Sequence, residues 1–421
     1  MNLDSEFEKH TLSNGVRVLM DRMDHVRSVA MGFFLEAGSR DESSPENGLA
    51  HVIEHMLFKG TERRDALRIA TESNTLGGHF NAFTTQDTVC LHARVVDEKL
   101  DAALDLLADL LGHSRHAPEE LERERNVILE EIYMYQDTPD EQVVDNFTEA
   151  LWQASSLGRP ILGTPETVSA FTREHILDFT GRHFAGDRLV VALAGNFDPQ
   201  HALAEVERQL AGFQPKGAQR TIERPAPVFS HVFDERDLEQ EHICIGCESI
   251  TRASEDRFAY SIMNWILGGG MNSRIFQEVR EKRGLAYSIG SFFRPYVDTG
   301  YFAISGGTRP ENAEEVMEIV LRETRKIYNE AVDAEELESA REALKGGVLM
   351  GLESTNWRMH RLADMELTFG RYIEVDEVIR RLDAVTVKDV QDVAERYLKG
   401  SPVGMAVIGP KALPQSDELK F

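Results

Sequence analysis

At 421 residues and 42% hydrophobic side chains, the chain is long enough for more than one domain and apolar enough to fill its cores. A formal net charge of −26 argues against nucleic acid as a partner. No apolar run approaches the ~18 residues of a membrane span, and the acidic start lacks the basic and apolar regions of a signal peptide. We therefore expect a multidomain protein in the cytoplasm of a bacterium.

The first half of the chain alternates between strand-like and helix-like patterns. A hairpin is predicted around Asn14-Gly15, the pair that favours a tight turn between strands. Strands are predicted at 7–12, 16–20, 29–37, 77–85, 88–95 and 189–194. Helices are predicted at 48–58, 66–76, 100–111, 119–132 and 201–210, and 157–163 is predicted to be a loop. This half ends near Phe213.

The helix at 48–58 carries His51, Glu54 and His55 in the order H-x-x-E-H. Residues four apart share a helix face, so the two imidazoles are placed to bind one zinc ion. Glu54 reaches the same face and can take a proton from water, and this inverted order is a known catalytic signature. The alternative is a pair of surface histidines on an ordinary helix. The apolar neighbours argue against it, because an unpaired ionisable group near a core is costly.

A catalytic zinc ion needs a third protein ligand, and the acidic helix at 119–132 offers candidates. Glu124 and Glu131 are two helical turns apart and share a face, whereas Glu130 is rotated by about 100° from Glu131. One carboxylate would bind the metal and the other would support the site. The spacing leaves open which does which. The alternative is that these acids are simply solvated.

The motif at 51–55 and the run E-R-N-V-I-L-E-E at 124–131 resemble the pitrilysin/insulinase family of zinc peptidases. Within that family the chain is most similar to the β subunit of mitochondrial processing peptidase and its bacterial relatives. The resemblance implies that His51, His55 and Glu131 bind zinc. It also implies that Glu54 is the general base and that Glu124 is the supporting carboxylate.

Residues 214–227 are rich in proline and charge and are predicted to be a linker, after which the pattern of the first half starts again. The chain therefore predicts an α+β protein of two homologous α/β domains, each a mostly antiparallel sheet packed with helices. We expect residues 1–213 to form the zinc-bearing domain and residues 228–421 to form a homologous domain without the metal site. In the repeat, His51, Glu54, His55 and Glu131 correspond to Ile262, Trp265, Ile266 and Gly347.

The second half has its own motif at 267–287, in which three glycines precede a helix. It lacks the Lys-Ser/Thr of a phosphate-binding loop, so nucleotide binding is not expected. The family resemblance implies that Arg280 holds a substrate carbonyl and that Tyr287 donates to the developing oxyanion. Without the resemblance, an exposed arginine and a strand tyrosine would be the simpler interpretation. Asn81 and Ala82 match the family's edge strand, to which a substrate peptide can add through main-chain hydrogen bonds.

The three cysteines do not form a disulfide framework. Cys244 and Cys247 lie in a strand-like run and should point to opposite faces, so we interpret them as core thiols. Cys90 stands where related chains often carry an aromatic residue, and Ser155-Ser156 stand where His-Pro is common. These departures leave the substrate preference open.

We expect a zinc endopeptidase that cleaves short or unfolded peptides inside a closed chamber. The family's four-domain clamshell would need two copies of this chain, so the resemblance implies a homodimer. Acidic residues that line the chamber would favour basic peptides, whereas an acidic surface would only aid solubility, and both stay open. The rival functions are a non-catalytic relative, such as a core subunit of a respiratory complex or the glycine-rich processing-peptidase subunit, and a peptide-binding or assembly module with structural zinc.

Overall fold

The computed structural model describes residues 6–153, 155–413 and 419–421. The acidic residues at the start of the chain that bear on a signal peptide lie largely outside this part. The chain forms two compact units, each built from three segments. The first unit is Met1–Tyr133, Arg159–Thr221 and Leu349–Asp376, and the second is Met134–Gly158, Ile222–Val348 and Glu377–Phe421.

The boundaries of these units differ from the contiguous division at 213 and 228 that the repeat suggested. Helix α5 (Pro139–Leu151) belongs to the second unit, and helix α13 (Thr355–Phe369) belongs to the first. The physical reason is packing: α5 contacts β8 and β11, and α13 contacts β2, β3 and β6. Each helix buries its apolar face on a sheet formed by residues far from it in the sequence.

The first unit contains a six-stranded sheet in the order β1-β2-β6-β3-β5-β4. Strands β2 and β6 run parallel and all other neighbours are antiparallel. The predicted hairpin is confirmed, with Gly15 at a φ of +91° in its turn. The strands are β1 (Glu6–Thr11), β2 (Arg17–Arg22), β3 (Ser28–Leu35), β4 (His79–Thr84), β5 (Val89–Val96) and β6 (Leu189–Gly195).

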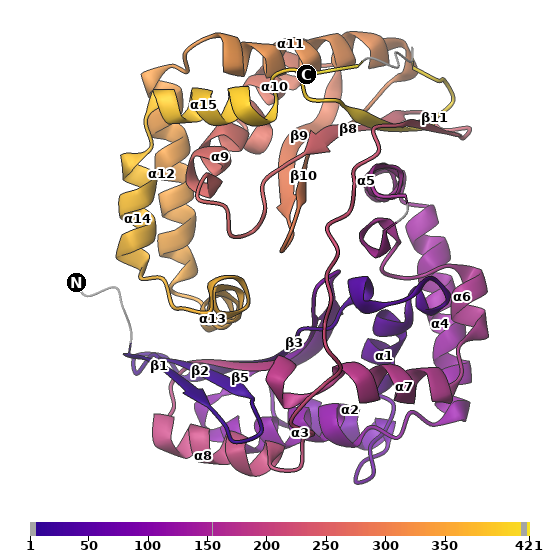
Figure 1. The fold of residues 1–421 in the computed structure, drawn as a ribbon, viewed down its shortest axis with the longest axis vertical. Coiled ribbons are helices and arrows are strands. Elements are labelled where there is room, and N and C mark those ends of the chain that lie inside the picture. Colours follow the sequence, from indigo (N-terminus) through magenta and orange to yellow (C-terminus); the bar gives the residue numbers. More distant parts are fainter. Residues whose placement is uncertain (1–5, 154, 414–418) are drawn as a thin grey trace. The chain divides into compact units, whose positions relative to one another are not determined.

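Helices cover both faces of this sheet, with α3 and α8 on one side and α13 on the other (Figure 1). The five helices predicted for the first half are confirmed, and α6 and α7 add to them. The helices of this unit besides α13 are α1 (Leu49–Leu57), α2 (Ala66–Thr75), α3 (Leu100–His113), α4 (Pro118–Gln136), α6 (Pro165–Ala170), α7 (Arg173–His183) and α8 (Pro199–Leu210).

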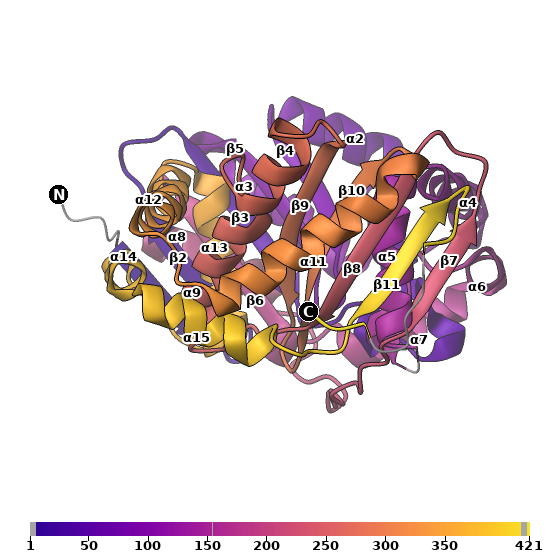
Figure 2. The ribbon, with the colours of Figure 1, turned by 90° about the horizontal axis from the view of Figure 1, so that it is seen from above.

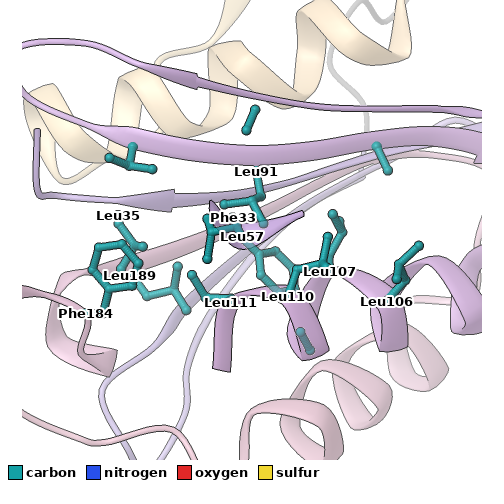
Figure 3. Packing of buried hydrophobic residues seen from close by; sticks show 14 of the residues in the cluster. Phe33, Leu35, Leu57, Leu91, Leu106, Leu107, Leu110, Leu111, Phe184 and Leu189 are labelled. Carbon is teal, nitrogen blue, oxygen red and sulfur yellow. The ribbon is translucent and has the colours of Figure 1, made fainter. Parts of the chain in front are cut away.

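The core of the first unit lies between the sheet and helices α1 and α3 (Figure 3). Phe33 of β3 and Leu107 of α3 are fully buried there. Phe34, the next residue of β3, packs on the opposite face against Met359 of α13. Because β3 is covered on both faces, its sequence is a continuous apolar run without polar alternation.

A buried ion pair ties α13 to the sheet of the first unit. The guanidinium of Arg358 lies 3.0 Å from a carboxylate oxygen of Asp21 on β2, and its Nε donates to the carbonyl of Leu352 at 2.6 Å. Asp21 and Arg358 are both buried. A charge in this position depends on its partner, because water cannot replace it.

The second unit repeats the arrangement with a five-stranded sheet in the order β7-β11-β8-β10-β9. Strands β7 and β11 are parallel and the other neighbours antiparallel. The predicted fold class, two α/β domains with mostly antiparallel sheets, is therefore confirmed. The strands are β7 (His231–Glu235), β8 (Glu241–Glu248), β9 (Ala286–Pro295), β10 (Gly300–Thr308) and β11 (Gly404–Gly409).

Figure 2 shows α11 (Ala313–Asn329) lying across the strands of this sheet, and α5 packs on the other face through Phe147. Cys244 belongs to the core under α5, and Cys247 to the core under the other helices, so the prediction that they face opposite sides is confirmed. The other helices are α9 (Arg257–Asn264), α10 (Arg274–Phe276), α12 (Ala334–Gly351), α14 (Val375–Ala384) and α15 (Val387–Tyr397).

Within the described ranges, none of the helices combines the length and the apolar character that a membrane crossing requires.

Candidate metal centre

Helix α1 carries the H-x-x-E-H motif and is buried along most of its length. Leu49, Val52, Ile53 and Met56 fill the core of the first unit, as the helical periodicity predicts. The opposite side of the helix presents the two histidines toward α4. His51 is buried, and its ring centroid lies 4.7 Å from that of His55. The local sequence thus holds two imidazoles one turn apart on a rigid element.

Glu131 of α4 completes a group of three potential metal ligands. Its Oε2 lies 3.8 Å from Nε2 of His51 and 3.5 Å from Nε2 of His55. In the described residues these side chains are the one set of three His, Cys, Asp or Glu whose ligand atoms cluster, all within 4.8 Å of one another. Glu130, its neighbour in sequence, is exposed. The helix phase predicted for Glu130 and Glu131 is therefore the one observed.

Glu124 contacts the ring of His55 at the nitrogen that does not face Glu131. Its Oε2 lies 3.2 Å from Nδ1 of His55, and its Oε1 accepts from Nζ of Lys59 at 2.7 Å. Burial alone would lower the pKa of His55, but the carboxylates of Glu131 and Glu124 outweigh it and raise that pKa. Nδ1 of His55 faces the carboxylate of Glu124, and Nε2 faces the carboxylate of Glu131. That arrangement orients the ring and selects the tautomer that a metal-binding histidine needs.

His51 has a different environment from His55. Burial, with a smaller contribution from the nearby His55, lowers the pKa of His51 against the opposing effect of Glu131. A neutral imidazole is the form that binds a metal ion. At Glu131, the hydrogen bond from His55 outweighs the effect of burial and lowers the pKa of the Glu131 carboxyl group. Glu131 is therefore anionic. The group thus offers two imidazoles and one carboxylate.

Glu54 lies beside this group and is held by the edge strand β4. Its Oε2 accepts a hydrogen bond from Oγ1 of Thr84 at 2.6 Å. Burial raises the pKa of Glu54, and the hydrogen bond from Thr84 opposes that shift. A carboxyl group with a raised pKa is suited to taking up a proton and releasing it again.

The remaining predicted site residues lie on β4 and in the second unit. Asn81 is exposed and Ala82 buried on β4, which is the last strand of its sheet. In the second unit, the Arg280 guanidinium stacks 4.7 Å from the ring centroid of Tyr287, and Tyr287 is 80% exposed. Arg280 and Tyr287 thus form one pair on the surface of that unit, and their role stays a prediction.

Two side chains that contact the site were not predicted from the sequence. Lys59 pairs with Glu124, and Thr84 hydrogen bonds to Glu54. Lys59 follows His55 by four residues, so helical spacing offered a signal for it. Thr84 lies on the predicted edge strand two residues after Ala82, but nothing local in the sequence indicates that its hydroxyl points to Glu54.

The donor set fits zinc. Ligands at ~2.1 Å in a tetrahedron lie about 3.4 Å from one another, and the two nitrogen–oxygen separations here are 3.5 and 3.8 Å. Two histidines and a glutamate are a ligand set found in catalytic zinc sites that keep a fourth position open for water. Glu124 provides the outer hydrogen bond that such a site requires.

Comparisons with known proteins agree with this geometry. Residues 17–165 match the model of the insulinase family, peptidase family M16, and residues 170–344 match the model of the peptidase M16 inactive domain. A relative from Bacillus subtilis, named an uncharacterized zinc protease, is 36% identical over 96% of this chain and 98% of its own length. A relative of the same description from Mycobacterium leprae is 37% identical over 96% of this chain and 91% of its own length.

Solved structures share the fold. A peptidase M16 inactive domain from Pseudomonas fluorescens superimposes with a TM-score of 0.91 at 24% identity, covering 98% of this chain and all of that one. A protease from Helicobacter pylori superimposes with a TM-score of 0.88 at 20% identity, covering 96% of this chain and all of that one. With the sequence matches along nearly the whole length, these observations lead to one conclusion: the chain belongs to the insulinase family of peptidases, peptidase family M16.

Proposed function

We propose that this protein is a zinc-dependent endopeptidase that cleaves short or unfolded peptides. The observation that carries the proposal is the group formed by His51, His55 and Glu131, with Glu54 held beside it by Thr84. Two bacterial relatives carry the name zinc protease, and these names support the same activity.

His51, His55 and Glu131 would hold the metal, and Glu124 would keep the ring of His55 in its binding orientation. Zinc, when bound, lowers the pKa of water and polarises the scissile carbonyl. The carboxylate of Glu54 would accept the proton of the attacking water and deliver it to the leaving amine. Thr84 fixes the direction in which that carboxylate points.

The edge strand β4 suggests how a peptide is held. In the described part of the sheet β4 pairs only with β5, so its outer edge is open to an added strand. Main-chain hydrogen bonds to the segment around Asn81 and Ala82 would bind an extended peptide largely independently of its sequence. The hydrogen bond from Thr84 to Glu54 ties this edge to the proposed base. Extended, unfolded substrates are the ones that such a site accepts.

A peptide library tests the activity. Wild-type protein and Glu54→Gln are incubated with the library, and cleavage is read by mass spectrometry alongside the zinc content of both. We expect about one zinc per chain in both and cleavage by the wild type alone. Zinc without cleavage in the wild type would favour a structural role for the metal, and no zinc in either would reject the site.

We further propose that two copies of the chain form a chamber, in which Arg280 and Tyr287 of one copy serve the metal site of the other. The proposal rests on the family resemblance, as does the closer likeness to the processing-peptidase β subunit. Mixing inactive Glu54→Gln with inactive Tyr287→Phe under subunit exchange should restore activity, because each mixed dimer then has one intact site. No recovery despite proven exchange would reject assembly in trans, and a monomer in solution would remove its premise.

The substrates we propose are peptides. The chain has a net charge of −26, and if its acidic residues line the chamber, basic peptides should be preferred. Such a preference should disappear as salt is added, because salt screens charge over about 10 Å at 0.1 M. A preference that salt leaves unchanged would instead point to pocket shape. The three buried free thiols suit a reducing compartment, and the bacterial cytoplasm is the one we propose.

A further inference from the structure

The first turn of helix α1 is held by a buried carboxyl group outside the H-x-x-E-H motif. Glu42 lies between β3 and α1 and is 4% exposed. One of its oxygens accepts from the N–H of Gly48 at 2.9 Å, and the other from the N–H of Ala50 at 2.7 Å. Both donors belong to the start of the helix, where N–H groups have no partner within the helix. Ala50 directly precedes His51, so Glu42 fixes the backbone from which His51 projects.

A neighbouring loop fixes the same turn from the other side. Nδ2 of Asn47 donates to the carbonyl of Pro160 at 2.8 Å. Gly48 has a φ of +95°, and a side chain there would meet Cα of Gly163 at 2.7 Å. The backbone entering α1 is therefore closely packed against this loop, and Glu42 additionally hydrogen bonds to the first turn of the helix.

The two histidine ligands differ in what orients them. Nδ1 of His55 faces the carboxylate of Glu124. Nδ1 of His51 is buried, and among the residues that the structure describes it has no hydrogen-bond partner. Within the described part of the chain, the outer partner that usually directs a metal-binding ring is thus present for His55 and absent for His51. The direction of the His51 ring must come from packing and from the position of its main chain.

We propose that Glu42 is a positioning residue for the metal site, which places His51 through the main chain as Glu124 places His55 through its ring. The inference rests on the proposed zinc site and adds one residue to it. Glutamine at position 42 would keep the size of the side chain but would offer only one acceptor atom. Whichever way the amide lies, either Gly48 or Ala50 loses its partner, and the first turn of α1 loosens.

The test measures zinc affinity by competition with a chromophoric chelator, together with the visible spectrum of the cobalt-substituted protein. For Glu42→Gln we expect zinc to bind about 10–100-fold more weakly, the usual effect of losing an outer partner, and an altered cobalt spectrum. Glu124→Gln should give a loss of the same order. A residue that only stabilises the fold would lower the melting temperature and leave the zinc affinity of the folded protein unchanged.

Two control variants separate positioning from general stability. Glu46 lies in the same loop, but its carboxylate accepts from the N–H of Ser43 and not from α1. Asp198 caps α8, a helix without metal ligands, by accepting from the N–H of His201 at 2.8 Å. Glu46→Gln and Asp198→Ala should both keep the zinc affinity of the wild type, although Asp198→Ala removes the cap and should melt earlier.

The outcomes keep this inference apart from the proposed function. Wild-type protein without stoichiometric zinc would refute the metal site itself. Zinc bound equally well by wild type and by folded Glu42→Gln would refute only the role of Glu42. Should Glu42→Gln not fold, Glu42→Asp takes its place, since it keeps the acid but withdraws it by one methylene, and its zinc affinity is read in the same way.

Discussion

The third metal ligand offers the sharpest test of the site, because two adjacent glutamates differ only in the helix face on which they lie. Oε2 of Glu131 approaches Nε2 of both His51 and His55, at 3.8 and 3.5 Å. Glu130 is exposed, and one residue along the helix corresponds to a rotation of about 100°. Glu131→Gln replaces an anionic ligand with a neutral amide, whereas Glu130→Gln removes the same charge from solvent.

The size of the expected effect follows from the energy of a zinc site. Zinc binds structural sites of four protein ligands with ~10–16 kcal/mol, so one ligand accounts for about 2.5–4 kcal/mol. Losing it should raise the zinc dissociation constant about 10²–10³-fold. Glu130→Gln should change that constant by less than about twofold, as surface substitutions do.

Calorimetric titration of zinc into the metal-free variants measures both dissociation constants under one condition. Peptide cleavage at saturating zinc then shows whether activity follows the bound metal. If Glu130→Gln weakened zinc binding while Glu131→Gln kept it, the helix phase on which the whole site is built would be wrong. Equal affinities for both variants would remove Glu131 from the ligand set.

Three further predictions follow from particular contacts. Glu54→Gln should keep its zinc and lose about 10²–10⁴-fold in turnover, so a variant of normal activity in a steady-state peptide assay would overturn its role as base. Burial lowers the pKa of His183 from 6.5 to about 4. As the pH falls, the unfolded protein binds a proton at His183 before the folded protein does. The free energy of unfolding should therefore drop by about 2 kcal/mol from pH 7 to pH 5, relative to His183→Gln. Urea unfolding at both pH values measures this difference, and the same stability at both would contradict the prediction. Arg358→Leu should cost about 3–5 kcal/mol, because it leaves Asp21 buried without its partner. The double variant with Asp21→Leu should recover part of that loss in the same unfolding assay, and no recovery would mean that the pair is not what holds α13.

Local periodicity was enough to predict much of this protein. Apolar residues at helical spacing put His51 and His55 on one face of a helix, because the period of 3.6 residues does not depend on the rest of the fold. The same argument separated Glu131 from Glu130, and the hairpin followed from Asn14-Gly15. The repeat predicted two similar domains, and the second sheet confirms it.

Only the tertiary structure shows which acid lies beside which histidine nitrogen. Glu124 and Glu131 share a helix face, so spacing alone could not tell ligand from support. The crossing of α1 and α4 brings Glu131 to the Nε2 atoms and Glu124 to Nδ1 of His55. The hydroxyl of Thr84 reaches Glu54 for a similar reason, because α1 lies against β4.

The membership of α5 and α13 in the two units also depended on long-range packing. Each helix is amphipathic, but its sequence does not say which sheet will bury its apolar face. Glu42 is one of three acids in the loop at 38–48, six residues before the helix cap at Gly48, and no capping motif distinguishes it from the other two. Its hydrogen bonds to Gly48 and Ala50 exist only because the loop folds back over the start of α1. Periodicity predicts the face that a residue occupies, whereas the partner on that face is set by chain segments that meet only in the folded protein.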